Sequence, residues 1–177
     1  DTETTGLLKP SAVDVSEQPH IIDIFCLKVN VECGLVTILD EFESLVKPPI
    51  PISDEITRIT RIDNSMVKDA PAFEEIAKPL AEFFLGTEEL VAHNLSFDRS
   101  MLTNELFRCN SVLNFPWPIN HTCTVERTMY IEQRRMSLTN LYKELFDGKS
   151  FPDAHRARPD VMAMFECYRE LVKQGVI

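Results

Sequence analysis

Two acidic side chains, Asp1 and Glu3, begin the sequence in the stretch D-T-E-T-T-G-L. In an extended strand alternate side chains lie on one face, so these two carboxylates are expected to point the same way. Carboxylates held side by side repel each other unless a cation, or one shared proton, lies between them. Taken alone, the stretch is explained equally well as a polar chain end in solvent. The rest of the sequence has to decide between a metal site and a solvated end.

Two further stretches place a carboxylate at the start of a predicted helix. In V-A-H-N-L-S-F-D, Asp98 follows a short apolar strand, at the end of a sheet where α/β proteins commonly bind ligands. In D-A-H-R-A-R-P-D, His155 precedes Asp160 by five residues. That spacing is about 140° around a helix, so the two side chains cannot share a face. We therefore place His155 in the preceding loop or cap, with Asp160 in the first turns, where Pro159 is tolerated.

The three stretches together supply four carboxylates and one imidazole: Asp1, Glu3, Asp98, Asp160 and His155. Singly, Asp98 and Asp160 are also explained by the helix dipole, and His155 by a helix-cap or surface position, but the whole set favours one site. Oxygen ligands with little nitrogen or sulfur suit Mg²⁺ or Mn²⁺ rather than zinc. Two such ions about 4 Å apart can hold a phosphate and activate a water. A histidine near that water can serve as general base.

The composition bounds the class of protein. The length of 177 residues predicts one domain, 1–177, and the abrupt start leads us to expect a first strand truncated at the N-terminus. The net charge of -10 gives no broad attraction for a polyanion, so nucleic acid would require bound cations or a local basic strip. Five cysteines without a C-x-x-C pair predict an intracellular, reducing compartment, cytoplasmic or nuclear. No apolar run predicts a membrane span and no signal peptide is present, so we expect no membrane partner.

The hydrophobic pattern predicts the elements that position these residues. A polar loop is expected over 9–19, and strands over 20–29, 35–46, 89–92 and 119–125. The helical period predicts helices over 72–85, 93–107, 137–146 and 156–173. Pro79 should bend the first of these helices or split its hydrogen-bond ladder. Strands first, then strands alternating with helices, predict an α/β domain with a mixed sheet.

The stretches D-T-E-T-T-G-L, H-N-L-S-F-D and H-R-A-R-P-D, in this order, resemble the three motifs of the DnaQ-like exonuclease superfamily. The patterns D-x-E, N-x-x-x-D and H-x-A-x-x-D match its histidine-containing (DEDDh) branch, which includes proofreading subunits and TREX-like 3′–5′ exonucleases. F-E-S-L-V-K-P is similar to the family's third strand and A-P-A-F-E-E-I to its first helix, so the likeness covers nearly the whole chain. Pro159 and the long loop from Leu8 to Pro19 depart from the family pattern.

The resemblance implies a ribonuclease-H-like fold, with a mixed five-stranded sheet flanked by helices, as a single exonuclease domain. It implies two divalent cations, Mg²⁺ or Mn²⁺, with Asp1, Glu3 and Asp160 holding one ion and Asp1 bridging to a second near Asp98. His155 would deprotonate the attacking water. The implied nucleotide-binding residues, including a leucine wedge against the last base and an asparagine that orients the second motif, are Thr4, Gly6, Leu7, Asn94 and Phe97.

The implied reaction is hydrolysis of terminal phosphodiester bonds at single-stranded or frayed 3′ ends, releasing nucleoside 5′-monophosphates. Two alternatives stay open: a catalytically silent nucleic-acid-binding module and a small-oligonucleotide phosphodiesterase. The first is disfavoured because every carboxylate and the histidine are present; the acidic charge slightly favours small substrates or a partner that delivers the strand. The sequence does not distinguish DNA from RNA. A polymerase or another protein could be a partner, and F-P-W-P-I, 115–119, is either an interaction site or, as we favour, a packed connector.

Overall fold

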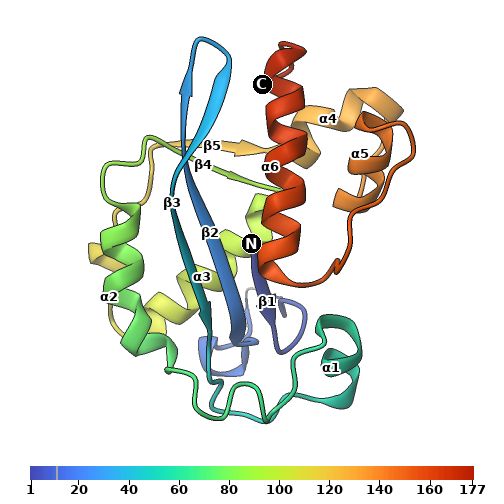
Figure 1. Ribbon diagram of the computed structural model, residues 1–177. Helices are drawn as coiled ribbons and strands as arrows, with labels where there is room; N and C mark the ends of the chain where they lie inside the picture. The colour runs from blue at the N-terminus through green and yellow to red at the C-terminus, as the bar shows by residue number, and fades with distance from the viewer. Residues whose placement is uncertain (11) are drawn as a thin grey trace.

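The computed structural model describes residues 1–10 and 12–177, and the side chains of 130–132 lie outside this description. Its strands are β1 (Thr2–Thr4), β2 (Ile21–Glu32), β3 (Leu35–Leu45), β4 (Glu89–Ala92) and β5 (Asn120–Cys123). β1, β2 and β3 form an antiparallel sheet in that order, and β4 pairs with β5 in parallel (Figure 1).

Six α-helices are described: α1 (Asp54–Thr60), α2 (Phe73–Phe84), α3 (Leu95–Arg108), α4 (Thr124–Glu132), α5 (Leu138–Leu145) and α6 (Ala157–Lys173). Short 3₁₀ turns add η1 (Val15–Glu17) and η2 (Val112–Asn114). In Figure 1, α2 and α3 lie on one side of β2 and β3, and α6 lies on the other. Helices on both faces of the strands make a layered α/β domain, as the sequence predicted.

The alternation of side chains along β2 explains the two helical layers. Ile24 is fully buried against α2 and α3, whereas its neighbour Phe25 is fully buried against the start of α6. Successive residues of a strand point to opposite faces, so an apolar run of this kind can bury both. β2 is therefore the central strand, and α6, which contains Asp160 of the third motif, packs against it.

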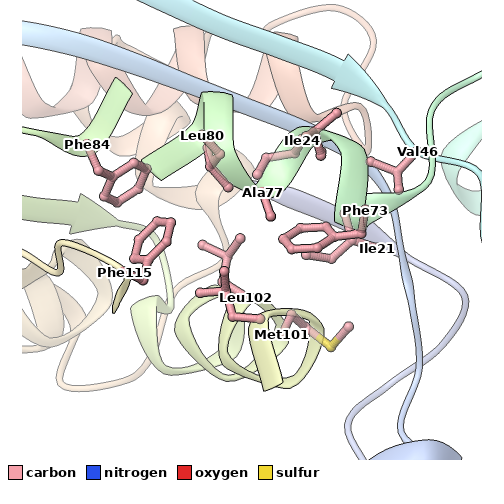
Figure 2. Packing of buried hydrophobic residues seen from close by; sticks show 12 residues of the cluster. Ile21, Ile24, Val46, Phe73, Ala77, Leu80, Phe84, Met101, Leu102 and Phe115 are labelled. Atoms are coloured by element: carbon pink, nitrogen blue, oxygen red, sulfur yellow. The ribbon is translucent and has the colours of Figure 1, made fainter. Parts of the chain in front are cut away.

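The main hydrophobic cluster joins β2 to α2 and α3 (Figure 2). The α2 residues that the helical period predicts to face inward are buried, except that Phe83 is only partly so. Pro79 lies on the exposed side of α2, and the helix continues through it unbroken, because the carbonyl left without a donor can bind water. The rings of Phe115 and Trp117 pack at a tilt, with centroids 4.6 Å apart, on this cluster, which confirms the packed connector, while Ile119 is exposed.

Two helices, and the start of a third, differ from the expectation. Ser53 accepts the backbone N–H of Ile56 and so begins α1, and α4 follows directly on β5; neither helix was predicted. α3 begins at Leu95 instead of 93, because Asn94 has a positive φ of 68° that ends the preceding turn. None of the helices in the described part of the chain is long and apolar enough to cross a bilayer.

The five predicted strands form a three-stranded sheet and a two-stranded pair instead of one continuous sheet. β1 has three residues and is paired, within the described chain, with β2 alone, over Ile21 to Ile24. Beyond that point a cavity of about 430 Å³ lies between β2 and β4, lined mostly by their side chains and those of α6. Within the described chain β1 does not pair with β4, so the two groups of strands are not joined.

Candidate active site

β1 presents its side chains to two different environments. Thr2 and Thr4 are buried, whereas Asp1 and Glu3 are half-buried, as strand alternation predicts for two carboxylates on one face. The backbone N–H of Phe25 donates to the Asp1 carbonyl at 3.2 Å, and Glu3 lies opposite Asp23 in the ladder with β2. The position of both carboxylates is therefore set by the central strand.

The start of α6 brings the third motif to the same place. His155 lies in the preceding loop with a φ of 69°, and Asp160 lies in the first turn of the helix, as the spacing predicted. The two residues are joined because the His155 backbone N–H donates to the Asp160 carboxylate at 3.2 and 3.3 Å. The imidazole itself is exposed to solvent, where it can meet a substrate or a water.

Three of the four predicted carboxylates converge. One carboxylate oxygen from each of Asp1, Glu3 and Asp160 lies within 4.8 Å of the others, which is close enough for a single ion to bind all three. Asp98 is not in this group, but it is close to it: it is buried in the first turn of α3 and accepts a hydrogen bond from Thr2 at 2.9 Å. Thr2 lies between Asp1 and Glu3, so the second motif is bonded directly to β1.

The electrostatics of this group require a proton or a cation. Burial raises the pKa of Glu3 from 4.5 to about 8, and the charges of Asp160, Asp23 and Asp98 add to the increase. Burial also raises the pKa of Asp160, an effect that the backbone N–H and charge of His155 partly offset. An oxygen-only group with this excess of negative charge fits Mg²⁺ or Mn²⁺, which neutralise it and accept such ligands.

The predicted nucleotide-binding residues lie beside the carboxylates. Thr4 donates its hydroxyl to the Gly6 carbonyl at 2.7 Å, which tightens the turn after β1. Leu7, directly after that turn, is 83% exposed, and such exposure of a leucine leaves its side chain free to contact a ligand. Phe97 is partly buried against the main cluster. The Asn94 side chain accepts a hydrogen bond from Arg135 at 3.0 Å, a partner outside the second motif.

The sequence did not point to three polar residues around this site. Asp23 is buried at the β2 position opposite Glu3, Arg156 donates to it at 3.2 Å, and Arg135 bonds to Asn94. The sequence could have drawn attention to Asp23, since a lone charged residue inside the apolar run H-I-I-D-I-F marks either a β-bulge or a buried functional group. The two arginines show no such feature, because their partners are distant in sequence.

A second buried ionic group fixes the long loop that follows β1. The Glu105 carboxylate accepts the Ile21 backbone N–H at 3.0 Å and pairs with His20 at 3.2 Å and Arg108 at 3.0 Å. Arg108 in turn donates to the carbonyls of Val15 and Gln18, both at 2.6 Å. The loop that follows Leu7 is thereby anchored to α3.

This fold, with acidic residues gathered at its first strand and at the starts of two helices, is that of a ribonuclease-H-like nuclease. The chain belongs to the RNase_T exonuclease family, of the DnaQ-like 3′–5′ exonuclease superfamily, since that family's model matches residues 1–168. The family and the fold that the three motifs implied are both confirmed.

Individual relatives agree with this assignment. The chain is 34% identical over 174 residues to the PolC-type DNA polymerase III of Caldanaerobacter subterraneus subsp. tengcongensis, covering 98% of this chain and 11% of that one. It is 29% identical to the DNA polymerase III subunit epsilon of Treponema pallidum, covering 97% of this chain and 74% of the relative. The chain therefore spans about a tenth of the length of the PolC-type relatives it matches.

Solved structures show the same likeness in three dimensions. Exonuclease X in complex with 5′ overhanging duplex DNA superposes with a TM-score of 0.66 at 27% identity, covering 98% of this chain and 89% of the other. A full-length 3′-exonuclease superposes with a TM-score of 0.74 at 19% identity, covering 99% and 80%, and supports the fold alone.

Proposed function

We propose that this protein is a metal-dependent 3′–5′ exonuclease that hydrolyses terminal phosphodiester bonds at single-stranded or frayed 3′ ends, releasing nucleoside 5′-monophosphates. The observation that carries the proposal is the convergence of Asp1, Glu3 and Asp160 within 4.8 Å, in a chain of an exonuclease family. Asp98, bonded to β1 through Thr2, completes the acidic set. The presence of all four carboxylates with His155 argues against a silent binding module.

The carboxylates are assigned to two divalent cations. Asp1, Glu3 and Asp160 would hold one ion, and Asp1 with Asp98 a second. When bound, Mg²⁺ or Mn²⁺ would neutralise the phosphate and lower the pKa of a water. The raised pKa of Glu3 supports this assignment, because the group is not stable with every carboxylate ionised and no counter-charge.

The side chains around the carboxylates have separate tasks. His155, exposed beside Asp160, would accept the proton of the attacking water. The turn from Thr4 to Gly6 and the exposed Leu7 would receive the terminal nucleotide, with the leucine against the last base and Phe97 nearby. Arg135, which donates a hydrogen bond to Asn94, would place a positive charge next to the nucleic-acid strand, in a protein whose net charge is -10.

The relatives favour DNA and a polymerase as partners. Two relatives of this chain are named as DNA polymerase III proteins, and one structural relative was solved with duplex DNA carrying a 5′ overhang. We therefore propose DNA 3′ ends as the main substrate and a replicative polymerase as the partner that presents them. The described cysteines are all unpaired, which fits a reducing intracellular compartment.

One experiment tests the reaction and the sugar together. Single-stranded DNA and RNA of equal sequence, labelled at the 3′ or 5′ end, are incubated with the protein and Mg²⁺, Mn²⁺ or EDTA. We expect stepwise shortening from the 3′ end, faster on DNA and abolished by EDTA and by Asp98→Asn. Cleavage of a dinucleotide in preference to the long strand would favour the small-oligonucleotide phosphodiesterase. Metal binding without cleavage of any of them would favour a silent binding module.

A further inference from the structure

The start of α6 is joined to the central strand by one buried ion pair. Arg156 Nε donates to the Asp23 carboxylate at 3.2 Å, across 133 residues of sequence. The Asp23 side chain is 5% exposed and that of Arg156 is 30% exposed, so most of the pair is shielded from water. Burial raises the pKa of Asp23, and the hydrogen bond and charge of Arg156 oppose that shift. Loss of Arg156 would therefore leave a buried carboxylate without its counter-charge, which is destabilising.

Asp23 lies beside the N-terminus of α6. The N-cap position of α6 is Arg156, whose side chain makes no capping bond to the helix. The backbone N–H of Ala157, at the first position of the helix, instead lies near the Asp23 carboxylate and lowers its pKa. Helix starts leave such N–H groups without intrahelical partners, and a carboxylate from another element can satisfy them. Ala157 is itself fully buried against Phe25 of β2.

The Asp23 carboxylate, on β2, also lies next to β1, the strand that carries Asp1 and Glu3. Asp23 lies opposite Glu3 in the antiparallel ladder, and side chains directly opposite each other share a face of the sheet. Its charge reaches Glu3 strongly enough to contribute to the raised pKa of that residue. On the other side of the ion pair, Arg156 is followed within one turn by Asp160, whose backbone N–H donates to the Arg156 carbonyl at 3.1 Å.

We propose that Asp23 and Arg156 are positioning residues, whose ion pair sets the distance between the carboxylates of β1 and the His155 and Asp160 pair at the start of α6. This inference rests on the proposed metal-dependent function. Neither residue is assigned to a metal: the oxygens that converge belong to Asp1, Glu3 and Asp160, and the Asp23 carboxylate accepts a hydrogen bond from Arg156. Their effect is exerted through the backbone of β2 and of the helix start.

The chain offers a matched control two residues further along α6. Arg158 also pairs with carboxylates, those of Glu41 and Glu43 on β3, but these groups are all close to half exposed. Its guanidinium lies over the Phe25 ring. Substitution of Arg158 therefore removes the same side chain from the same turn, and removes an ion pair, without touching Asp23.

The test measures Mn²⁺ binding by calorimetry for the unsubstituted protein, Asp23→Asn, Arg156→Met and Arg158→Met. We expect Asp23→Asn and Arg156→Met each to weaken Mn²⁺ binding about 10–100-fold, as loss of an outer hydrogen-bond partner does. The double substitution should be no worse than the worse single one, because both break one pair. Arg158→Met should bind within about twofold of the unsubstituted protein, since exposed pairs contribute little.

Kinetics and circular dichroism complete the test. For the two positioning variants kcat should fall while KM for the DNA strand changes little, and Arg156→Lys should recover part of the loss. If Arg156→Met folds poorly, the isosteric Asp23→Asn answers the same question. A raised KM with unchanged Mn²⁺ affinity would make Arg156 a strand contact and overturn the positioning role. Equal Mn²⁺ affinity in every variant would also overturn it, whereas no Mn²⁺ binding by the unsubstituted protein would overturn the metal site itself.

Discussion

Glu3 and Glu105 are acidic side chains in the interior of one small domain, and their pKa values shift in opposite directions. Burial raises the pKa of both, but the neighbours differ. Glu3 faces further carboxylates, and its pKa reaches about 8. Glu105 faces His20, Arg108 and a backbone N–H, which together outweigh burial and lower its pKa. Negative charge is in excess around Glu3, whereas positive and hydrogen-bond-donating groups surround Glu105.

This difference in charge balance distinguishes a candidate active site, around Glu3, from a structural ion-pair group, around Glu105. The group around Glu105 is complete within the protein and holds the loop after β1 against α3. The group around Glu3 becomes electrostatically satisfied only when a cation or protons are added. An excess of like charge that the surrounding chain does not neutralise is thus the physical mark of the candidate active site, and burial alone is not.

The largest effect is expected from Glu3→Gln. Loss of one ligand should remove several kcal/mol of transition-state stabilisation, which is a fall in kcat of about 10³–10⁴-fold. The melting temperature of the metal-free protein should stay the same or rise, because the substitution removes a carboxyl group whose ionised form is disfavoured in the folded state. Exonuclease assays with calorimetric melting check both halves. Retained activity in a well-folded variant would show that Glu3 holds no essential ion.

His155→Ala should lower kcat by about 10²–10⁴-fold, the range for a lost general base. Its exposed ring is not part of the core, so the melting temperature should be unchanged. The measurement is the pH–rate profile of the variant beside that of the unsubstituted protein. An acidic limb that survives the substitution would assign the base to another group.

Glu105→Gln should show the opposite pattern to Glu3→Gln. Removing one partner of a buried ionic group costs about 3–5 kcal/mol of folding free energy, because Arg108 is left with an uncompensated charge. Urea unfolding measures this loss, with the exposed Glu74→Gln as a control that should change little. Activity per folded molecule should be nearly retained. A variant of unchanged stability would contradict the supporting role of this group.

The sequence predicted the two groups unequally, for a physical reason. The motifs around Asp1, Asp98 and Asp160 carry their chemistry in local spacing, so their roles could be proposed before their positions were known. Helices α2 and α3 were predicted equally well, because an apolar face repeats along each of them. The supporting pairs join residues far apart in sequence, 84 positions for Ile21 with Glu105 and 133 for Asp23 with Arg156, and no local pattern records such partners.

The two arginines at the start of α6 also show that local sequence does not predict distant partners. Arg156 and Arg158 are separated by one residue in H-R-A-R-P-D, and nothing in the sequence says that one pairs with a buried carboxylate and the other with exposed ones. The separation of β4 from β1 was equally hidden, since the strand pattern predicts strands but not which edges meet.

A pH titration of stability distinguishes the two glutamates directly. Between pH 4.5 and about 8, folded metal-free protein keeps a proton on Glu3 that the unfolded chain has lost. Unfolding free energy should therefore fall as the pH rises through this window, and Glu3→Gln should remove that slope. Mn²⁺ affinity should rise over the same range, because the ion competes with the proton. The contribution of Glu105 has the other sign: it is present above pH 4.5 and is lost as the pH falls below that value.

The smallest effect is expected at an ion pair outside both groups. Arg61 bonds to Asp153 at 2.7 Å, and both side chains are more than 60% exposed, although Asp153 lies only two residues before His155. Exposed pairs contribute about 0–1 kcal/mol, because water and salt screen the charges. Arg61→Ala should therefore change the unfolding free energy by less than about 1 kcal/mol and leave kcat unaltered. A large fall in kcat would mean that the loop before α6 is held in place by this contact, and that support for the site extends beyond the Asp23–Arg156 pair.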